Sequence, residues 1–472
     1  MKVELPAARQ SLSLVPLALA MLLPSLGTSI ANVALPALET AFDASLGRVQ
    51  WVVLAYLLAV TTLIVGVGRL GDLFGRRKLL LAGMAVFSLA AAGAAMAPSL
   101  NFLIAARAAQ GAGAATMMAL AIASVSDLVP TERTGSVMGL LGTVSAVGTA
   151  LGPSLGGALL ASGGWPSVFV AIAAAGLATF VVGLRTLPQS PAREQAPSTF
   201  DLPGMLLLAA SLGAFALSTT VGNDHPGLLN AGLAALAVTG FAGLSLVERR
   251  AVTPLIDIER LMERRLGAGL ISLGLVSTIM MATLVVGPFY LTETLSLSPV
   301  QTGLVMSLGP AVAALAGLPA GRLVDRYRSS STMMTGLSVI TIGAALMTVL
   351  PGLFGTGGYA GSLIVITAGY AQFQAANTTA AMSDAPSDRR GVTSGLLGLA
   401  RNLGLITGAS AMGAVFAVGS HGIEFLGLAP GRSAGMSLTF GVATLIAATA
   451  GGIIVWSKRT TPQRERDAHR TT

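Results

Sequence analysis

Two arginines lie inside long apolar stretches of this 472-residue chain, where a charge is costly to bury. Arg107 and Arg401 each lie several residues from the nearest end of their stretch. Ionisable residues in such segments are rare and mark binding sites or pathways, so both arginines are candidate functional residues. The alternative is that each side chain extends to the end of its segment, or bonds to backbone carbonyls there.

The acidic residues are distributed differently, because none lies deep inside an apolar stretch. Those closest to such stretches lie at the ends: Asp127, Asp201, Glu293 and Asp384. A cavity with two arginines and no acid would be positive, which predicts a neutral or anionic lipophilic ligand. If protons are bound and released, the residues left to carry them are Asp72, Asp127 and Glu293.

Uncharged polar side chains complete the candidate binding set. Those inside the apolar stretches are Asn32, Gln110, Gln372, Gln374 and Asn377, with Met117, Met118, Met280 and Met281 as adaptable apolar walls. Gln372 and Gln374 cannot both face one cavity from a helix, and methionine pairs more often pack than bind. We predict a cavity lined by Asn32, Arg107, Gln110, Gln374, Asn377 and Arg401.

The composition excludes a soluble enzyme, a nucleic-acid-binding protein and a scaffold held by disulfides. Apolar side chains make up 53% of the chain and charged ones 10%, against about 25% charge in soluble domains, so the chain could not cover its surface in water. There is no cysteine, and His225, His421 and His469 are too scattered for a metal site, so no metal or cofactor is expected. The net charge of +8 comes from short basic clusters between apolar runs, which indicates membrane orientation rather than nucleic-acid binding.

Apolar stretches of about 20 residues can cross a bilayer as helices, and fourteen such stretches follow one another. The chain is therefore predicted to be an all-α polytopic membrane protein whose first stretch is retained rather than cleaved. The stretches lie near residues 12–36, 49–68, 79–97, 100–126, 136–160, 166–184, 203–221, 229–247, 267–291, 299–320, 332–351, 358–382, 391–418 and 434–456.

Lysine and arginine are strongly asymmetric when the loops are taken alternately. One side carries 24 of the 28 basic residues, the other carries Arg48 and Arg432, and Arg107 and Arg401 lie within stretches. Cytoplasmic loops are enriched in basic residues. This predicts a multi-pass protein of the cell (inner or plasma) membrane with both termini in the cytoplasm.

An internal repeat divides the chain. Residues 130–142 (PTERTGSVMGLLG) recur as 386–398 (PSDRRGVTSGLLG), and residues 68–72 (GRLGD) recur as 321–325 (GRLVD). Both pairs are shifted by eight stretches, which predicts two six-helix halves with two extra helices between them. The predicted divisions are an N-terminal half (1–187), a linker with the extra helices (188–265), a C-terminal half (266–456) and a basic cytoplasmic tail (457–472).

Duplicated halves are typical of alternating-access transporters, which bind substrate near the bilayer midplane between the halves. A repeat can also record ancestry alone, so a channel or a membrane scaffold could share it.

Several motifs resemble those of the major facilitator superfamily and, within it, of the fourteen-span drug:proton antiporters. Residues 68–78 (GRLGDLFGRRK) resemble the signature loop between helices 2 and 3, and 107–111 (RAAQG) resemble that of helix 4. Glycines and a proline from Gly139 to Gly157 resemble the antiporter motif of helix 5. Residues 50–58 (QWVVLAYLL) and 32–36 (NVALP) resemble the fourteen-span group in particular. The resemblance implies the major facilitator fold and a secondary transporter, not an enzyme, that exports small lipophilic compounds or drugs in exchange for protons.

The resemblance also implies roles in gating and coupling. Asp72, with Asp325 as its counterpart in the repeat, would cap a neighbouring helix in one state, and Arg76 would reach Asp127. The resemblance assigns Arg107 to coupling, and Gly152 and Pro153 to blocking leak. The alternatives are a static turn held by anchoring charges and simple tight packing at the glycines.

One departure from the family pattern concerns helix 1. Gly27 stands where these relatives usually have an aspartate, which puts cation recognition and proton transfer by helix 1 in doubt. The expected partners are a small lipophilic substrate, protons and the lipid bilayer, without nucleic acid, and the chain is expected to be monomeric. Two alternatives remain: an uptake permease or uniporter of the same superfamily, and a non-transporting membrane sensor or lipid-handling protein.

Overall fold

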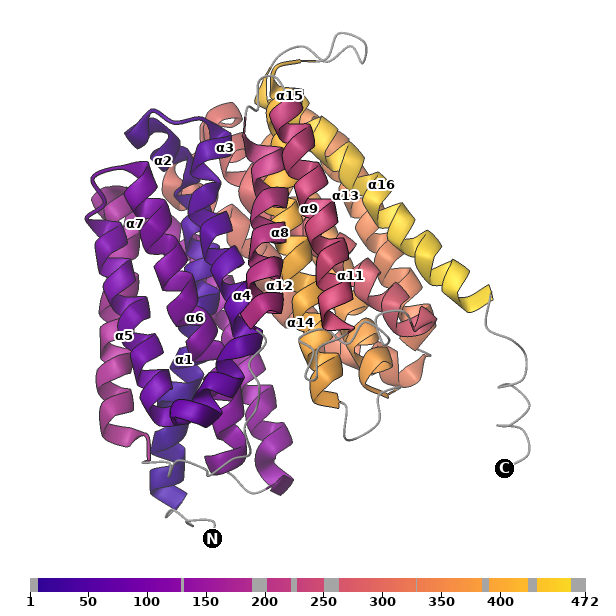
Figure 1. Cartoon of the computed structure of the whole chain (residues 1–472). Helices are drawn as coiled ribbons and strands as arrows, with labels where there is room; N and C mark the ends of the chain where they lie inside the picture. Colours follow the sequence, from indigo (N-terminus) through magenta and orange to yellow (C-terminus); the bar gives the residue numbers. More distant parts are fainter. Residues whose placement is uncertain are drawn as a thin grey trace, which may run out of the picture.

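A computed structural model of the chain shows a bundle of long helices (Figure 1). It describes residues 7–128, 131–188, 202–221, 227–249, 263–327, 329–383, 390–422 and 431–459. Every regular element in these ranges is helical, which confirms the all-α prediction.

The first bundle is formed by α1 to α7. Within it, α1 packs along α7, and α6 lies between α4 and α5. One buried apolar cluster consists only of residues between Leu17 and Leu187, so this bundle has its own core. Its helices are α1 (Ala7–Val33), α2 (Leu35–Phe42), α3 (Leu46–Val49), α4 (Trp51–Phe74), α5 (Arg76–Ala95), α6 (Leu100–Leu128) and α7 (Thr131–Thr186).

The second bundle is formed by α11 to α16 and lies beside the first (Figure 1). Two of its helices include a π-helical turn, η1 after α11 and η2 after α14. Its elements are α11 (Arg264–Phe289), η1 (Tyr290–Thr294), α12 (Pro299–Arg326), α13 (Ser329–Ser383), α14 (Arg390–Thr407), η2 (Gly408–Met412), α15 (Gly413–Ser420) and α16 (Arg432–Arg459).

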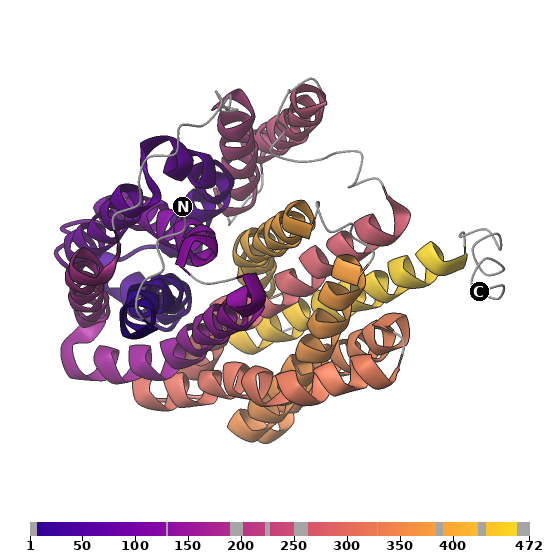
Figure 2. The same ribbon diagram turned by 90° about the horizontal axis from the view of Figure 1, so that it is seen from below.

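Two further helices, α8 (Leu202–Thr220) and α9 (Leu228–Glu248), lie between the bundles in sequence. They pack against each other on one flank of the molecule (Figure 2). The Trp51 indole Nε1 of α4 donates to the Thr220 hydroxyl of α8 over 2.9 Å. Trp51 thus fastens this pair to the first bundle.

Twelve helices in the described ranges are long and apolar enough to cross a membrane. The predicted count of fourteen separate helices is not confirmed, because α7 and α13 each contain two of the predicted stretches. These helices have 56 and 55 residues, and each contains non-helical backbone, at Gly163 and Gly164 in α7 and at Gly355 in α13. Helix continues on both sides of these glycines, so no long loop separates the stretches.

The bundles meet closely where α7 crosses α12. A Cβ atom on Gly157 would collide with the carbonyl oxygen of Pro299, and one on Gly303 would collide with that of Pro153. The glycines thus allow the two backbones to touch. This junction lies near α2, because Leu160 of α7 and Pro299 of α12 line the same cavity as Glu39 of α2. The end of the molecule that carries α2 is called the α2 end (Figure 1).

Candidate functional site

Arg107 is fully buried and ties three helices of the first bundle together. From α6 its Nε donates to the Val52 carbonyl of α4 over 2.9 Å, and its Nη2 donates to the Gly27 carbonyl of α1 over 3.1 Å. Its Nη1 donates to Gln110 Oε1 over 2.6 Å. The guanidinium lies 4.2 Å from the centre of the Tyr56 ring, whose hydroxyl donates to the Pro24 carbonyl.

None of the hydrogen-bond or ring partners of Arg107 among the described residues is acidic. Its charge is balanced by carbonyl dipoles and an aromatic face, both of which stabilise a buried cation. Gly27 contributes only its carbonyl, and a Cβ added there would lie 3.6 Å from both Phe87 Cζ and the Tyr56 hydroxyl, at ordinary contact distance. Gly27, which stands where the family pattern has an aspartate, therefore lies directly beside the buried arginine.

Two more predicted cavity residues lie near Arg107 in the first bundle. The Asn32 Nδ2 donates to the Thr28 carbonyl over 2.9 Å, while its Oδ1 has no hydrogen-bond partner in the described part of the chain. Gln110 accepts from Arg107, but its Nε2 has no described partner. Both side chains are buried. Each therefore has one polar atom free to bind a group that enters.

The other three predicted cavity residues belong to the second bundle. Gln374 and Asn377 lie on α13, and Arg401 lies on α14, with Tyr370 beside both Gln374 and Arg401. Within the described ranges, Gln374 Oε1, Asn377 Nδ2 and Arg401 Nε are buried atoms without a hydrogen-bond partner. Asn377 also contacts Gly269 of α11.

Gln372 has a different environment, since its Nε2 donates to the Thr335 hydroxyl over 2.6 Å in an exposed position. Gln372 and Gln374 thus have different partners, although they are two residues apart.

The six predicted cavity residues form two groups of three, one in each bundle. No hydrogen bond or ion pair between described residues joins the two groups. Five of the six have a buried polar atom without a partner in the described part of the chain, whereas each guanidinium nitrogen of Arg107 donates a hydrogen bond. An unpaired buried polar group costs about 1–3 kcal/mol, so a ligand that supplies its partner is favoured. No group of three or more potential metal ligands occurs among the described residues.

Gly152 and Pro153 lie where α7 meets both α1 and α12. A Cβ atom on Gly152 would collide with the Ser29 hydroxyl of α1. The Pro153 carbonyl contacts Gly303 of α12. These two residues therefore permit close packing of one helix against two others.

Arg76 begins α5 and reaches α6, where its Nη1 donates to the Ala123 carbonyl over 2.7 Å. The side chains of its predicted partner Asp127, of Asp72 and of Asp325 lie outside the described part of the structure.

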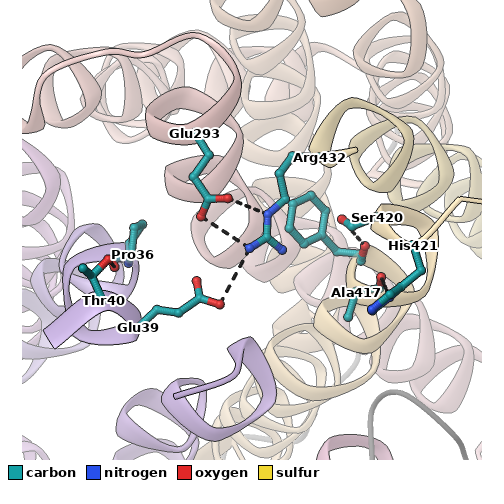
Figure 3. Close-up of polar contacts among 9 residues, drawn as sticks. Pro36, Glu39, Thr40, Glu293, Ala417, Ser420, His421 and Arg432 are labelled. Carbon is teal, nitrogen blue, oxygen red and sulfur yellow. Dashed lines mark hydrogen bonds and ion pairs between the residues drawn. The ribbon is translucent and has the colours of Figure 1, made fainter. Parts of the chain in front are cut away.

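A charged cluster at the α2 end joins the two bundles (Figure 3). Arg432, at the start of α16, bonds Glu293 of η1 through Nε to Oε2 over 2.6 Å and through Nη2 to Oε1 over 3.4 Å. Glu39 of α2 approaches the same Nη2 to 3.7 Å. Burial raises the pKa of the Glu39 carboxyl above its usual value, Arg432 lowers it, and Glu293 raises it further.

A cavity of about 770 Å³ adjoins this cluster. Glu39, Asp43, Glu293 and Arg432 all contribute to its lining, together with the buried Thr302, whose hydroxyl has no described partner. The sequence singled out Glu293 and Arg432 but missed Glu39, which follows an apolar stretch like many ordinary loop charges. The sequence signal that could have found Glu39 is that Glu39, Glu293 and Arg432 all lie on the side of the membrane that is predicted to carry few basic residues.

Comparisons with known proteins agree with this architecture. The sequence profile of the Major Facilitator Superfamily matches residues 17–409. The riboflavin transporter RibZ of Clostridioides difficile (strain 630) is 30% identical over 395 residues, which cover 83% of this chain and 85% of RibZ. The tetracenomycin C resistance and export protein of Streptomyces glaucescens is 29% identical over 408 residues, which cover 86% of this chain and 76% of that protein.

The fold is also that of a solved transporter. The inward-facing, occupied structure of a bacterial homolog to the human lysosomal transporter Spinster superposes with a TM-score of 0.72 at 15% sequence identity. The match covers 97% of this chain and 98% of that structure. The chain therefore belongs to the Major Facilitator Superfamily, and it is a multi-pass plasma-membrane transporter rather than an enzyme.

Proposed function

We propose that this transporter exports small lipophilic compounds, neutral or anionic, by alternating access in exchange for protons. The observation that carries the proposal is the division of five unpaired polar atoms between the two bundles. A compound bound between the bundles would supply partners to both groups. Alternating access exposes such a site to one side of the membrane at a time.

The charge balance supports the proposed substrate class. The predicted cavity residues include Arg107 and Arg401 and no acid, and the described partners of Arg107 are all neutral. A cation would therefore meet two positive charges without a counter-ion. The relative named as a tetracenomycin C resistance and export protein supports export as the direction of transport.

We further propose fourteen spans, with α7 and α13 each crossing the membrane twice. A continuous 56-residue helix would be about 84 Å long, whereas the apolar core of a bilayer is about 30 Å thick. The non-helical glycines near the middle of both helices support this assignment. In this arrangement α8 and α9 are the two inserted helices, and the protein acts as a monomer.

We place both termini in the cytoplasm, which makes the α2 end the external end. The asymmetry of lysine and arginine supports this orientation. The close backbone contact at the α2 end, between Gly157 of α7 and Gly303 of α12, then keeps the external side closed.

The test measures accumulation of cationic, neutral and anionic lipophilic dyes in cells that express the protein, with and without a protonophore. We expect expression to lower the accumulation of neutral or anionic dyes, and the protonophore to restore it. Gln374→Ala should weaken export severalfold, whereas Gln372→Ala is the matched control and should not. Expulsion of cations alone would contradict the proposed substrate class.

The main alternative is uptake of a small molecule by the same alternating-access cycle. In the same cells an uptake permease would raise the accumulation of its substrate above that of cells without the protein. If no compound moves in either direction, a non-transporting sensor becomes the better assignment.

A further inference from the structure

The cluster of Glu39, Glu293 and Arg432 contains two carboxylates and a single cation. With all three groups ionised, its charge is −1. Two other titratable groups line the adjoining cavities, Asp43 in the segment after α2 and His421 after α15. Glu39 thus faces titratable or charged groups from η1, from α16 and from the residue after α15, as well as from its own segment.

The contacts of Arg432 are strongly unequal. Glu293 bonds it through two atoms, and its guanidinium carbon lies 5.7 Å from the Phe289 ring centre and 5.5 Å from that of Phe416. All three partners belong to the second bundle. Glu39 comes from the first bundle and lies 3.7 Å away, so it is the member of the cluster that separates when the bundles part.

Closure carries Glu39 from water into a partly shielded site. Its side chain is 24% exposed here, and that of Arg432 is 25% exposed. The arginine is already neutralised by Glu293, so an ionised Glu39 adds an uncompensated negative charge. Two carboxylates that share one cation favour retention of a proton by one of them.

We propose that Glu39 takes up a proton from the external solution when the α2 end closes, and that this proton stabilises the closed arrangement. The step transfers one proton from external water to the Glu39 carboxylate, and the charge of the cluster changes from −1 to 0. The inference rests on the proposed orientation and on alternating access. The chain has no acid deep in an apolar stretch. The cluster at the α2 end then supplies a site where proton binding favours one conformation.

The direction of the effect follows from linkage. The state in which a carboxyl has the higher pKa binds the proton more tightly, so acidification stabilises that state. Burial raises the pKa of Glu39 in the closed arrangement, and an open arrangement would return the carboxyl to water. Closure of the α2 end should therefore be favoured at low pH, and the effect should be lost as the pH rises above the raised pKa.

The test measures the distance between spin labels on Ala41→Cys of α2 and Val300→Cys of α12 in lipid nanodiscs without substrate. Both positions are exposed, and the chain has no native cysteine to interfere. Between pH 8 and pH 4.5, which is the ordinary pKa of a glutamate carboxyl, we expect the short-distance population to grow, with a closed-to-open ratio that rises by at most about tenfold per pH unit for one proton.

Matched variants identify the group that binds the proton. Glu39→Gln mimics the protonated carboxyl, so it should keep the α2 end closed at both pH values. Asp43→Asn and His421→Gln alter neighbouring titratable groups and should keep the full pH response. Arg432→Gln leaves two carboxylates together, so closure should fall at pH 8 and recover in acid.

The proposal is overturned if acid has no effect or opens the α2 end, if Glu39→Gln retains the response, or if that variant loses the closed population. These distances require no transported compound. If dyes are not exported but the distance between the spin labels still responds to pH, only the export proposal is rejected. If export is driven by protons but the distance does not respond to pH, the proton is bound at a site other than Glu39.

Discussion

Arg107 and Arg432 are two arginines of one chain with opposite surroundings. Arg107 is fully buried, and its hydrogen bonds go to neutral groups of the first bundle. Arg432 is partly exposed and faces two carboxylates, one from each bundle. The comparison shows that the partners of a buried or partly buried arginine decide its effect on the structure. An arginine whose hydrogen bonds all stay inside one bundle stabilises that bundle, whereas an arginine that contacts both bundles forms an interaction that can break when the bundles separate.

The largest expected effect comes from Arg107→Ala. The substitution removes the hydrogen bonds from Arg107 to α1 and α4 and leaves a void where a large, fully buried side chain had packed. We expect a loss of roughly 3 kcal/mol or more in the free energy of unfolding. Thermal unfolding in detergent measures it, with Arg432→Ala as the comparison. A larger loss for Arg432→Ala would contradict the assignment of Arg107 as the structural arginine.

Gly152→Ala tests the packing of the first bundle at a second point. The added Cβ would collide with Ser29 of α1, and we expect a destabilisation of about 1–3 kcal/mol. Gly142→Ala, on the same helix, is the matched control, because a Cβ there meets no atom within 4 Å. Equal unfolding temperatures for the two variants would show that α1 and α7 are not held at this distance.

Gly27→Asp would make the surroundings of Arg107 more like those of Arg432. A carboxylate at this position would lie beside the guanidinium and supply the missing counter-ion. We expect the ratio of cationic to anionic dye export to rise by about fivefold, the equivalent of about 1 kcal/mol. An unchanged ratio would mean that Arg107 does not influence which charge the cavity accepts.

The smallest effect on stability is expected for Glu39→Gln. The Glu39 side chain is partly exposed and 3.7 Å from its partner, so the free energy of unfolding at pH 7 should change by about 0–1 kcal/mol. Thermal unfolding measures this. If Glu39→Gln lowered the free energy of unfolding as much as Arg107→Ala does, the contacts of Arg432 and those of Arg107 would contribute equally to stability, against the comparison made above.

Much of the fold was predictable because the requirement for apolar helices of bilayer length acts locally. The apolar stretches gave the helical class and the approximate positions of the helices. The count of fourteen separate helices was not confirmed, because Gly163, Gly164 and Gly355 interrupt α7 and α13 without forming long loops. A glycine-rich break inside an apolar run and a loop between two runs look alike in sequence.

The candidate site was predictable only as a set of residue types. Arg107 stood out because a charge in an apolar stretch is rare. Its partners Val52 and Gly27 did not, since they contribute backbone carbonyls that every residue has. Glu39 was missed because its importance depends on Arg432, almost 400 residues away in the chain.

The sequence by itself determined the membrane-spanning helices, the internal repeat and the absence of an acid from the apolar stretches, because these properties depend on side-chain chemistry along one dimension. Only the tertiary structure decided that Arg107 bonds within one bundle and that Arg432 contacts both bundles. A charge acts over a few ångströms in space, and only the folded chain brings Glu39, Glu293 and Arg432 within that range.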